Sequence, residues 1–311
     1  LSGDAPLSCA ECHNPKKAWT DGLALSKGYP TSLYFRNTPA LLNTVHKKLV
    51  YWDGRLPGDD LPTVVRDHLS EAHFMQTDGR LVIERLRQVP EYEETFKAAY
   101  GGAPSYGSIL NALSAYLKSL VSEETPLDRY LSGDVNALSA SATRGLTLFQ
   151  GKARCAQCHA GPMLTDERFH RLGVKDNPEV FTEPLRHITF RRFFKTFGVE
   201  GYQALREDVG LAAITKEPQD KGKFKTPSLR EVARTPPYMH NGTIESLEAV
   251  VEFYNQGGGD VANKDPELSP LGLSEQEKQD LVAFLKALSG KETTVEAPSV
   301  PEYQLRELGK N

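Results

Sequence analysis

All four cysteines of the chain lie in two short motifs with the same pattern, Cys-x-x-Cys-His. The motifs are formed by Cys9, Cys12 and His13, and by Cys155, Cys158 and His159. This pattern is the attachment signature of c-type haem, because two thiols bond the porphyrin and the adjacent imidazole reaches the iron. The alternative is one zinc site made of four thiolates, but paired zinc motifs are usually separated by about 15–20 residues, and this gap is far longer. The sequence therefore predicts two covalently bound haem c groups.

The haem motifs also predict a compartment. Haem is attached to such motifs outside the bacterial cytoplasm, so we expect an exported, periplasmic protein. The sequence starts at Leu1 with neither an initiator methionine nor a signal peptide, and we interpret it as the mature or ordered portion of that protein.

Composition excludes two kinds of partner. The 311 residues are 39% hydrophobic and 25% charged, which is ordinary for a globular chain of one large or two smaller domains. The 37 basic and 41 acidic residues give a net charge of −4, whereas nucleic-acid-binding domains usually have a basic excess. No apolar run approaches the roughly 18 residues needed to cross a bilayer. We therefore expect neither a nucleic-acid partner nor a membrane span.

The region after each haem motif repeats. Thr38-Pro39 is followed by Tyr51-Trp52-Asp53-Gly54, and Thr226-Pro227 is followed by Met239-His240-Asn241-Gly242, with fifteen residues from proline to glycine in both cases. Shared elements at shared spacing indicate two copies of one haem-binding unit. We predict a mainly α fold of two cytochrome c-like haem domains packed together with long loops. Their predicted extents are 1–134 and 135–290, with a polar extension over 291–311.

Four segments have helical signals. Apolar residues at helical spacing and Ser caps predict helices over 107–121, from Ser139 to about 149, from Thr243 or Ser246 to about 254, and from Ser274 to about 288. No segment alternates convincingly enough to predict a strand. Phe190, Phe193, Phe194 and Phe197 form an aromatic stripe in the unrepeated segment 177–222. The stripe could dock a partner protein, but aromatic stripes are usually core.

These motifs together resemble one family. The chain is similar over about residues 1–290 to the di-haem bacterial cytochrome c peroxidases and, more closely, to their relative MauG. The resemblance rests on both haem motifs and on residues 36–39, 52–55, 224–230 and 237–242. It implies that His13 and His159 are proximal iron ligands and that Trp52 lies between the haems. It also implies an interdomain calcium ion held by oxygen atoms of Asn37, Thr235 and Pro237.

The resemblance also implies which residues lie on the distal side of each haem. The position that carries a methionine ligand of the C-terminal haem in the peroxidases carries Tyr254 here, as in MauG. Met163 and Met239 are the alternative ligands, although methionine is more often a packing residue. Classical members close the N-terminal haem with a histidine after Thr-Asp-Gly, but that place falls near Tyr29 and no histidine occurs from 14 to 45. We therefore expect a five-coordinate N-terminal iron.

Peroxide cleavage needs a group that moves a proton between the two oxygens. The distal glutamate of the family maps to Glu71. His68, at the position equivalent to Tyr254 when Leu61 is matched to Leu247, is the alternative base and could even be a sixth ligand.

The sequence thus predicts a di-haem peroxidase. Hydrogen peroxide reacts at the N-terminal haem, Glu71 assists, and Trp52 shares oxidising equivalents with the C-terminal haem. Electrons come from a cytochrome c or from side chains of a partner protein, and Tyr254 favours the second donor. The alternative from another class is a non-catalytic di-haem electron-transfer cytochrome.

Overall fold

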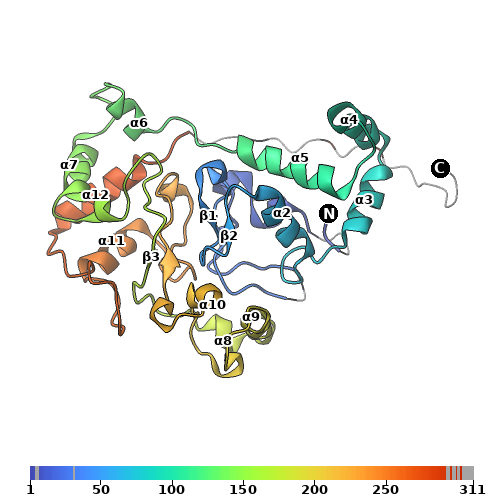
Figure 1. Ribbon diagram of the computed structural model, residues 1–311. Coiled ribbons are helices and arrows are strands. Elements are labelled where there is room, and N and C mark those ends of the chain that lie inside the picture. The colour runs from blue at the N-terminus through green and yellow to red at the C-terminus, as the bar shows by residue number, and fades with distance from the viewer. Residues whose placement is uncertain (4–6, 31, 292–294, 296–298, 300–301, 303–311) are drawn as a thin grey trace.

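The computed structural model describes residues 1–3, 7–30, 32–291, 295, 299 and 302. The fold is mainly helical, as predicted, and the two haem motifs belong to two units that lie side by side (Figure 1). Almost all of the predicted extension 291–311 lies outside the described residues. The helices of the first unit are α1 (Cys9–Cys12), α2 (Leu61–Ser70), α3 (Gly79–Arg87), α4 (Pro90–Tyr100) and α5 (Tyr106–Ser119).

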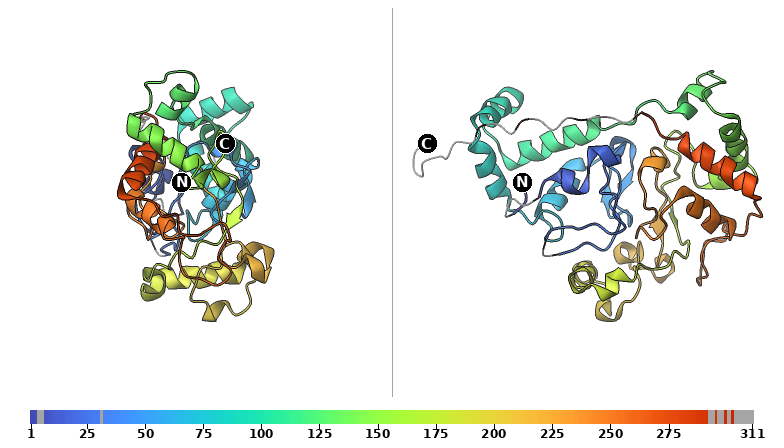
Figure 2. Two further views of the ribbon diagram at one scale, coloured as in Figure 1. Left: turned by 90° about the vertical axis from the view of Figure 1, so that its left-hand side faces the viewer. Right: turned by 180° about the vertical axis from the view of Figure 1, so that it is seen from behind.

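The second unit holds the remaining long helices and a separate insert. The helices of its haem-binding part are α6 (Pro126–Leu131), α7 (Ala140–Gln150), α11 (Leu247–Asn255) and α12 (Glu275–Lys286). The insert contains α8 (Glu179–Thr182), α9 (Pro184–Thr196) and α10 (Ala212–Thr215), which lie together below the two units (Figures 1 and 2). Leu127 of α6 packs into the core of the second unit, so α6 belongs there although it precedes residue 134.

Capping residues explain where the predicted helices begin. Ser139 accepts a hydrogen bond from Ala142 N at the start of α7, and Ser246 does so from Ala249 N at the start of α11. Ser274 and Glu277 form the predicted capping box of α12, and such boxes satisfy amide groups that the first turn leaves free. The predictions for these helices are confirmed, with Ser246 rather than Thr243 as the cap of α11.

Two short ladders were not expected from the sequence. β1 (Leu49–Val50) pairs antiparallel with β2 (Leu56–Pro57), and β3 (Phe169–His170) pairs antiparallel with β4 (Phe224–Lys225). Each strand has only two residues, which is too short for an alternating pattern to be recognised.

The aromatic stripe of α9 is part of a hydrophobic core. Phe190, Phe193 and Phe194 are almost fully buried, and all three pack against Phe35 of the first unit. The core interpretation of this stripe is therefore confirmed, and these rings are not available to dock a partner. They attach the insert to the first unit.

The backbone confirms the internal repeat. Asn43 and Glu231, four residues after the two matched prolines, have φ of 61° and 64°, and short 3-10 helices follow at Thr44–His46 and Val232–Arg234. Tyr51 and Met239 share φ of 68° and 73°. Non-glycine residues rarely adopt positive φ, so its recurrence at matched positions marks two copies of one backbone path.

The two units contact each other reciprocally through the repeated glycines. A Cβ atom on Gly54 would lie 2.4 Å from the Phe169 ring, and a Cβ atom on Gly242 would lie 2.3 Å from Cα of Ala24. Ala24 and Phe169 occupy nearly equivalent places after the two haem motifs. The glycine turn of each unit therefore packs against the other unit. This contact brings the two haem motifs to one shared space.

Candidate functional site

One large cavity joins the two haem motifs. Its volume is about 1590 Å³, larger than the roughly 300–1,000 Å³ of ordinary small-molecule pockets. Its lining includes side chains of both motifs, namely Cys9, Cys12, His13, Cys155, Cys158 and His159. The residues present thus fit two large planar groups attached to those thiols.

The two motif histidines are held alike. His13 Nδ1 lies 3.1 Å from the Trp19 carbonyl oxygen, and His159 Nδ1 lies 3.0 Å from that of Leu164. A hydrogen bond at Nδ1 fixes the tautomer and leaves Nε2 to bind a metal. Burial, reinforced by the nearby His68, lowers the pKa of His13 to about 4, which keeps the ring in the neutral form that a metal requires.

Tyr254 lines the cavity at the second motif. It lies in the last turn of α11. Burial and the nearby sulfur atoms of Cys155 and Cys158 raise the pKa of its phenol, and no described residue forms a hydrogen bond with its hydroxyl. Of the alternative ligands, Met239 also lines the cavity but Met163 does not.

His68 lines the cavity at the first motif. Its Nδ1 lies 2.8 Å from the Tyr51 hydroxyl and 3.1 Å from the Val64 carbonyl oxygen. The Tyr51 hydroxyl also donates to Asp67 at 2.7 Å, and the two rings stack with centroids 5.4 Å apart. Burial lowers the pKa of His68 to about 4, so the imidazole is neutral at physiological pH.

Glu71 is placed differently from His68. It follows α2 directly, its side chain is 41% exposed, and it does not line the cavity. Its carboxylate lies 3.9 Å from Nδ1 of His73, and burial together with Asp67 raises its pKa. The structure therefore brings His68, but not Glu71, to the first haem motif.

Trp52 connects the two units. Its indole N–H donates to the Asn37 carbonyl oxygen at 3.0 Å, and its own carbonyl oxygen accepts from Lys225 N at 2.9 Å. Asn37 in turn donates its backbone N–H to the His240 carbonyl oxygen at 2.8 Å. His240 lines the cavity with its ring stacked on Phe224 at 3.6 Å. The tryptophan is thus held on the cavity wall by bonds that cross between the units.

The residues expected to hold calcium come together only in part. The Asn37 side-chain amide lies 2.8 Å from the Leu23 carbonyl oxygen and 3.4 Å from that of Pro237. The amide nitrogen of Asn37 faces these two carbonyl oxygens. The amide would therefore have to turn by half a rotation for its oxygen to bind a cation together with them. Thr235 lines the same cavity. Calcium prefers six to eight oxygen ligands, and this cluster supplies some of them.

A buried charge network ties the insert to the first unit. The Arg36 guanidinium donates to Asp53 at 2.5 Å and to both oxygens of Asp208 at 2.7 and 2.9 Å. Arg55 shares Asp53 at 3.2 Å and lies over the Tyr51 ring at 3.3 Å. Arg36 and Asp53 are fully buried, so their charges depend on one another.

Two lysines line the cavity wall, and Lys47 lacks such compensation. The Lys47 ammonium donates to the Ala40 carbonyl oxygen at 2.9 Å but forms no ion pair with a described carboxylate. Lys225 lies 3.7 Å from Glu167. Burial and the charge of Lys225 lower the pKa of Lys47 to about 7. Sequence patterns did not single out either lysine, although both flank the repeated motifs. The ammonium group of Lys47, which has no carboxylate partner among the described residues, suits a carboxylate of a haem.

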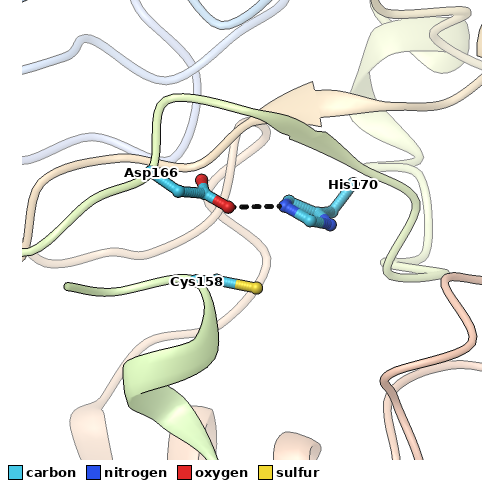
Figure 3. A group of neighbouring side chains, drawn as sticks. All are labelled: Cys158, Asp166 and His170. Carbon is cyan, nitrogen blue, oxygen red and sulfur yellow. Dashed lines mark hydrogen bonds and ion pairs between the residues drawn. The ribbon is translucent and has the colours of Figure 1, made fainter.

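Cys158, Asp166 and His170 form a cluster with metal-ligating atoms (Figure 3). The Cys158 sulfur, followed by Asp265 and Asp166, raises the pKa of His170 to about 10. Because Cys158 is one of the haem-attachment thiols, its sulfur is committed once the thioether forms. The cluster is therefore part of the second haem site, with His170 hydrogen-bonded to Asp265 at 2.5 Å.

Comparison with known proteins agrees with this geometry. The family model described as di-haem cytochrome c peroxidase matches residues 1–136. The cytochrome-c peroxidase IdrP2 of Denitromonas iodatirespirans is 49% identical over 100% of this chain and 84% of its own length. The methylamine utilization protein MauG of Methylorubrum extorquens is 35% identical over 97% of this chain and 78% of its own. The chain belongs to the di-haem cytochrome c peroxidase and MauG family. Its members include named peroxidases, and the chain is a peroxidase of this family.

Solved structures support the same assignment. A MauG-like protein associated with microbial copper homeostasis superposes with a TM-score of 0.80 and 29% identity over 93% of this chain and 85% of its own. The di-haem peroxidase BthA of Burkholderia thailandensis superposes with a TM-score of 0.72 at 22% identity, over 97% of this chain and 86% of its own, and shows the same fold. Di-haem peroxidases carry two haem c groups, which the two Cys-x-x-Cys-His motifs account for. None of the described helices has the length and apolar character to cross a membrane.

Proposed function

We propose that this di-haem peroxidase consumes hydrogen peroxide in the N-terminal half of its cavity and takes up electrons in the C-terminal half. The observation that carries this proposal is the single cavity that both haem motifs, Trp52, His68 and Tyr254 line. When bound, the haem irons supply the redox chemistry. The chain supplies the proximal imidazoles, the distal side chains and the connection between the halves.

Trp52 is the proposed connection. Its ring lies on the cavity wall, and its indole N–H and carbonyl oxygen are both hydrogen-bonded. An aromatic ring held rigidly between two redox centres can relay an electron without moving. Replacing Trp52 with Phe keeps a ring but removes the hydrogen bond to Asn37, so we expect slower electron exchange between the halves.

Tyr254 is the proposed distal ligand of the C-terminal haem. The Tyr254 side chain is half-buried and lines the cavity, and no described residue forms a hydrogen bond with its hydroxyl. The oxygen is therefore free to bind a metal, and metal binding would lower the phenol pKa. As a hard anionic ligand, a phenolate stabilises the oxidised state of an iron, whereas methionine raises its potential.

Proton transfer at the N-terminal haem has two candidates, His68 and Glu71. His68 lines the cavity and is neutral, so it can accept a proton. Glu71 lies outside the cavity, but its raised pKa suits a group that carries a proton. A Glu71→Gln variant distinguishes them: a rate lowered by about 10²-fold or more would assign the transfer to Glu71. An unchanged rate would assign it to His68 or to water.

The external electron donor is a cytochrome c or a partner protein. The relatives named cytochrome-c peroxidase favour the first donor, and Tyr254, which the family resemblance links to MauG, favours the second. We further propose that the enzyme works in the periplasm and that a calcium ion binds near Asn37, Thr235 and Pro237. A chelator should then lower the thermal stability of the holoenzyme, and added calcium should restore it.

Turnover with defined donors tests the function. We expect the diferric holoenzyme to consume hydrogen peroxide and to oxidise either a reduced c-type cytochrome or tyrosine and tryptophan side chains of a protein. The Trp52→Phe variant should oxidise the donor more slowly. A holoenzyme with both haems that leaves peroxide unchanged with every donor would be an electron carrier, and the proposal would be wrong.

A further inference from the structure

Besides Trp52 the chain has one other tryptophan, Trp19, which lies beside the N-terminal haem motif. Its carbonyl oxygen lies 3.1 Å from Nδ1 of His13. Two backbone hydrogen bonds close the loop between them: Trp19 N–H donates to the Asn14 carbonyl oxygen at 2.9 Å, and Asn14 N–H donates to that of Thr20 at 3.0 Å. Trp19 is only 5% exposed and lines the cavity. Its indole is therefore held against the space of the N-terminal haem.

Tyr116 continues from Trp19 to the surface. The two rings meet edge to face, with centroids 6.0 Å apart and planes at 69°, which is within the range of direct aromatic contact. Tyr116 lies on α5, along the edge of the first unit (Figure 1), and is 46% exposed. Of the described tyrosines that line the cavity, it alone is exposed. The pair thus joins the haem space to solvent through two aromatic rings.

This pair leads in a different direction from Trp52. Trp52 accepts a hydrogen bond from Lys225 of the other unit, so it connects the two halves of the cavity. Trp19 instead packs among apolar residues of its own unit, including Leu42 and Leu120. A route through Trp19 therefore leads away from the C-terminal haem motif and ends at solvent.

We propose that Tyr116 is a surface oxidation site, at which phenols in solution give electrons to the N-terminal half of the enzyme through Trp19. The inference rests on the proposed function, because hydrogen peroxide must supply the oxidising equivalents in that half. Reduction of one peroxide molecule to two water molecules takes up two electrons and two protons. For each of these electrons, Tyr116 loses one electron through Trp19 and its hydroxyl proton to water, and becomes a neutral tyrosyl radical.

The chemistry of Tyr116 selects the donor. Partial burial, followed by the nearby Cys9, raises the pKa of its hydroxyl, so the resting side chain is a neutral phenol that must lose a proton together with the electron. A phenol donor returns both at once: its O–H bond breaks, the hydrogen atom passes to the Tyr116 oxygen, and the donor leaves as a phenoxyl radical. One phenolic O–H bond is exchanged for another of the same kind, so the step is close to balanced in energy. The donor need not enter the cavity.

Electron spin resonance after peroxide addition tests this site. When one equivalent of hydrogen peroxide is added to the diferric holoenzyme without a donor, we expect a tyrosyl radical signal from the wild type. The signal should be lost in Tyr116→Phe and weakened in Trp19→Phe, because phenylalanine is harder to oxidise than tryptophan or tyrosine. Tyr100→Phe is the matched control, since Tyr100 is 44% exposed but does not line the cavity, and it should leave the signal unchanged.

Turnover of a phenol gives a second readout. Oxidation of 2-methoxyphenol should slow severalfold in Tyr116→Phe, whereas oxidation of reduced cytochrome c, whose electrons enter at the C-terminal half, should stay unchanged. Peroxide consumption by the wild type without a tyrosyl radical, or an unchanged radical signal in Tyr116→Phe, would overturn the inference and leave the proposed function in place. An equal fall in the oxidation of both donors would also overturn it, because Tyr116 would then not be a separate site. A holoenzyme that consumes no peroxide with any donor would contradict the proposed function as well.

Discussion

Substituting Gly242 with Ala tests whether the two units close on each other through the repeated turns. Gly242 has φ of +61°, and a Cβ atom there would lie 2.3 Å from Cα of Ala24 and 2.4 Å from the Ala24 carbonyl oxygen. These are backbone atoms of the other unit, so they cannot move aside as a flexible side chain does. Gly101 offers the matched control, because its φ is +78° and nothing lies within 4 Å of its Cβ position.

The expected cost follows from two terms. Placing an alanine at positive φ costs about 1–2 kcal/mol at either site. Forcing an extra methyl group into a packed contact adds about 1–3 kcal/mol at Gly242 alone. Gly242→Ala should therefore lower the free energy of unfolding by about 2–5 kcal/mol, whereas Gly101→Ala should lower it by about 1–2 kcal/mol.

Denaturant unfolding of the holoenzyme, followed by circular dichroism, measures both values. The contact also predicts that Gly242→Ala loosens the cavity, so its haem absorption bands should broaden or shift while those of Gly101→Ala stay unchanged. Equal losses of stability in the two variants, with unchanged haem bands in both, would refute the reciprocal contact as a source of stability.

Two further predictions concern buried charges. Arg36→Leu leaves Asp208 without its guanidinium partner and should lower the free energy of unfolding by about 3–5 kcal/mol. The control Arg80→Leu removes the exposed pair with Asp78 and should lower it by at most about 1 kcal/mol. Urea unfolding compares the two variants, and similar losses of stability would contradict the role of the network. At pH 6, below the Lys47 pKa of about 7, Lys47→Met removes a cation from the cavity wall and should lower a haem midpoint potential by on the order of 1 kcal/mol per electron. Lys48→Met, at an exposed side chain, should leave the potential unchanged. Spectroelectrochemical titration measures both, and equal potentials in the two variants would mean that Lys47 does not face a haem carboxylate.

Local patterns predicted the elements that local interactions determine. The cysteine spacing predicted both haem sites, and Ser139 and Ser274 placed the starts of α7 and α12 within a residue. The start of α11 was left between Thr243 and Ser246, and the structure has Ser246 as the cap. The repeat between the halves was visible in the spacing of Pro39 and Gly54 and of Pro227 and Gly242, and the structure confirms it through matched positive φ angles.

The structure was needed for interactions between distant segments. Arg36 and Asp208 are separated by 172 residues in the sequence, and no periodicity links them. The uncompensated Lys47 is visible only once its neighbours are known. His68 lines the cavity from the last turn of α2, whereas Glu71, directly after the helix, does not, and no sequence pattern shows this difference. Family resemblance alone assigned the proton transfer to Glu71.

The central claim is that the two haem sites act as one redox unit through Trp52. Its most direct test adds one equivalent of hydrogen peroxide to the diferric holoenzyme and follows the absorption of both haems by stopped-flow spectroscopy. We predict that both haems change in a single kinetic phase in the wild type and in two separate phases in Trp52→Phe. If only one haem responds in the wild type, or if Trp52→Phe behaves like the wild type, the two sites are not coupled through this residue.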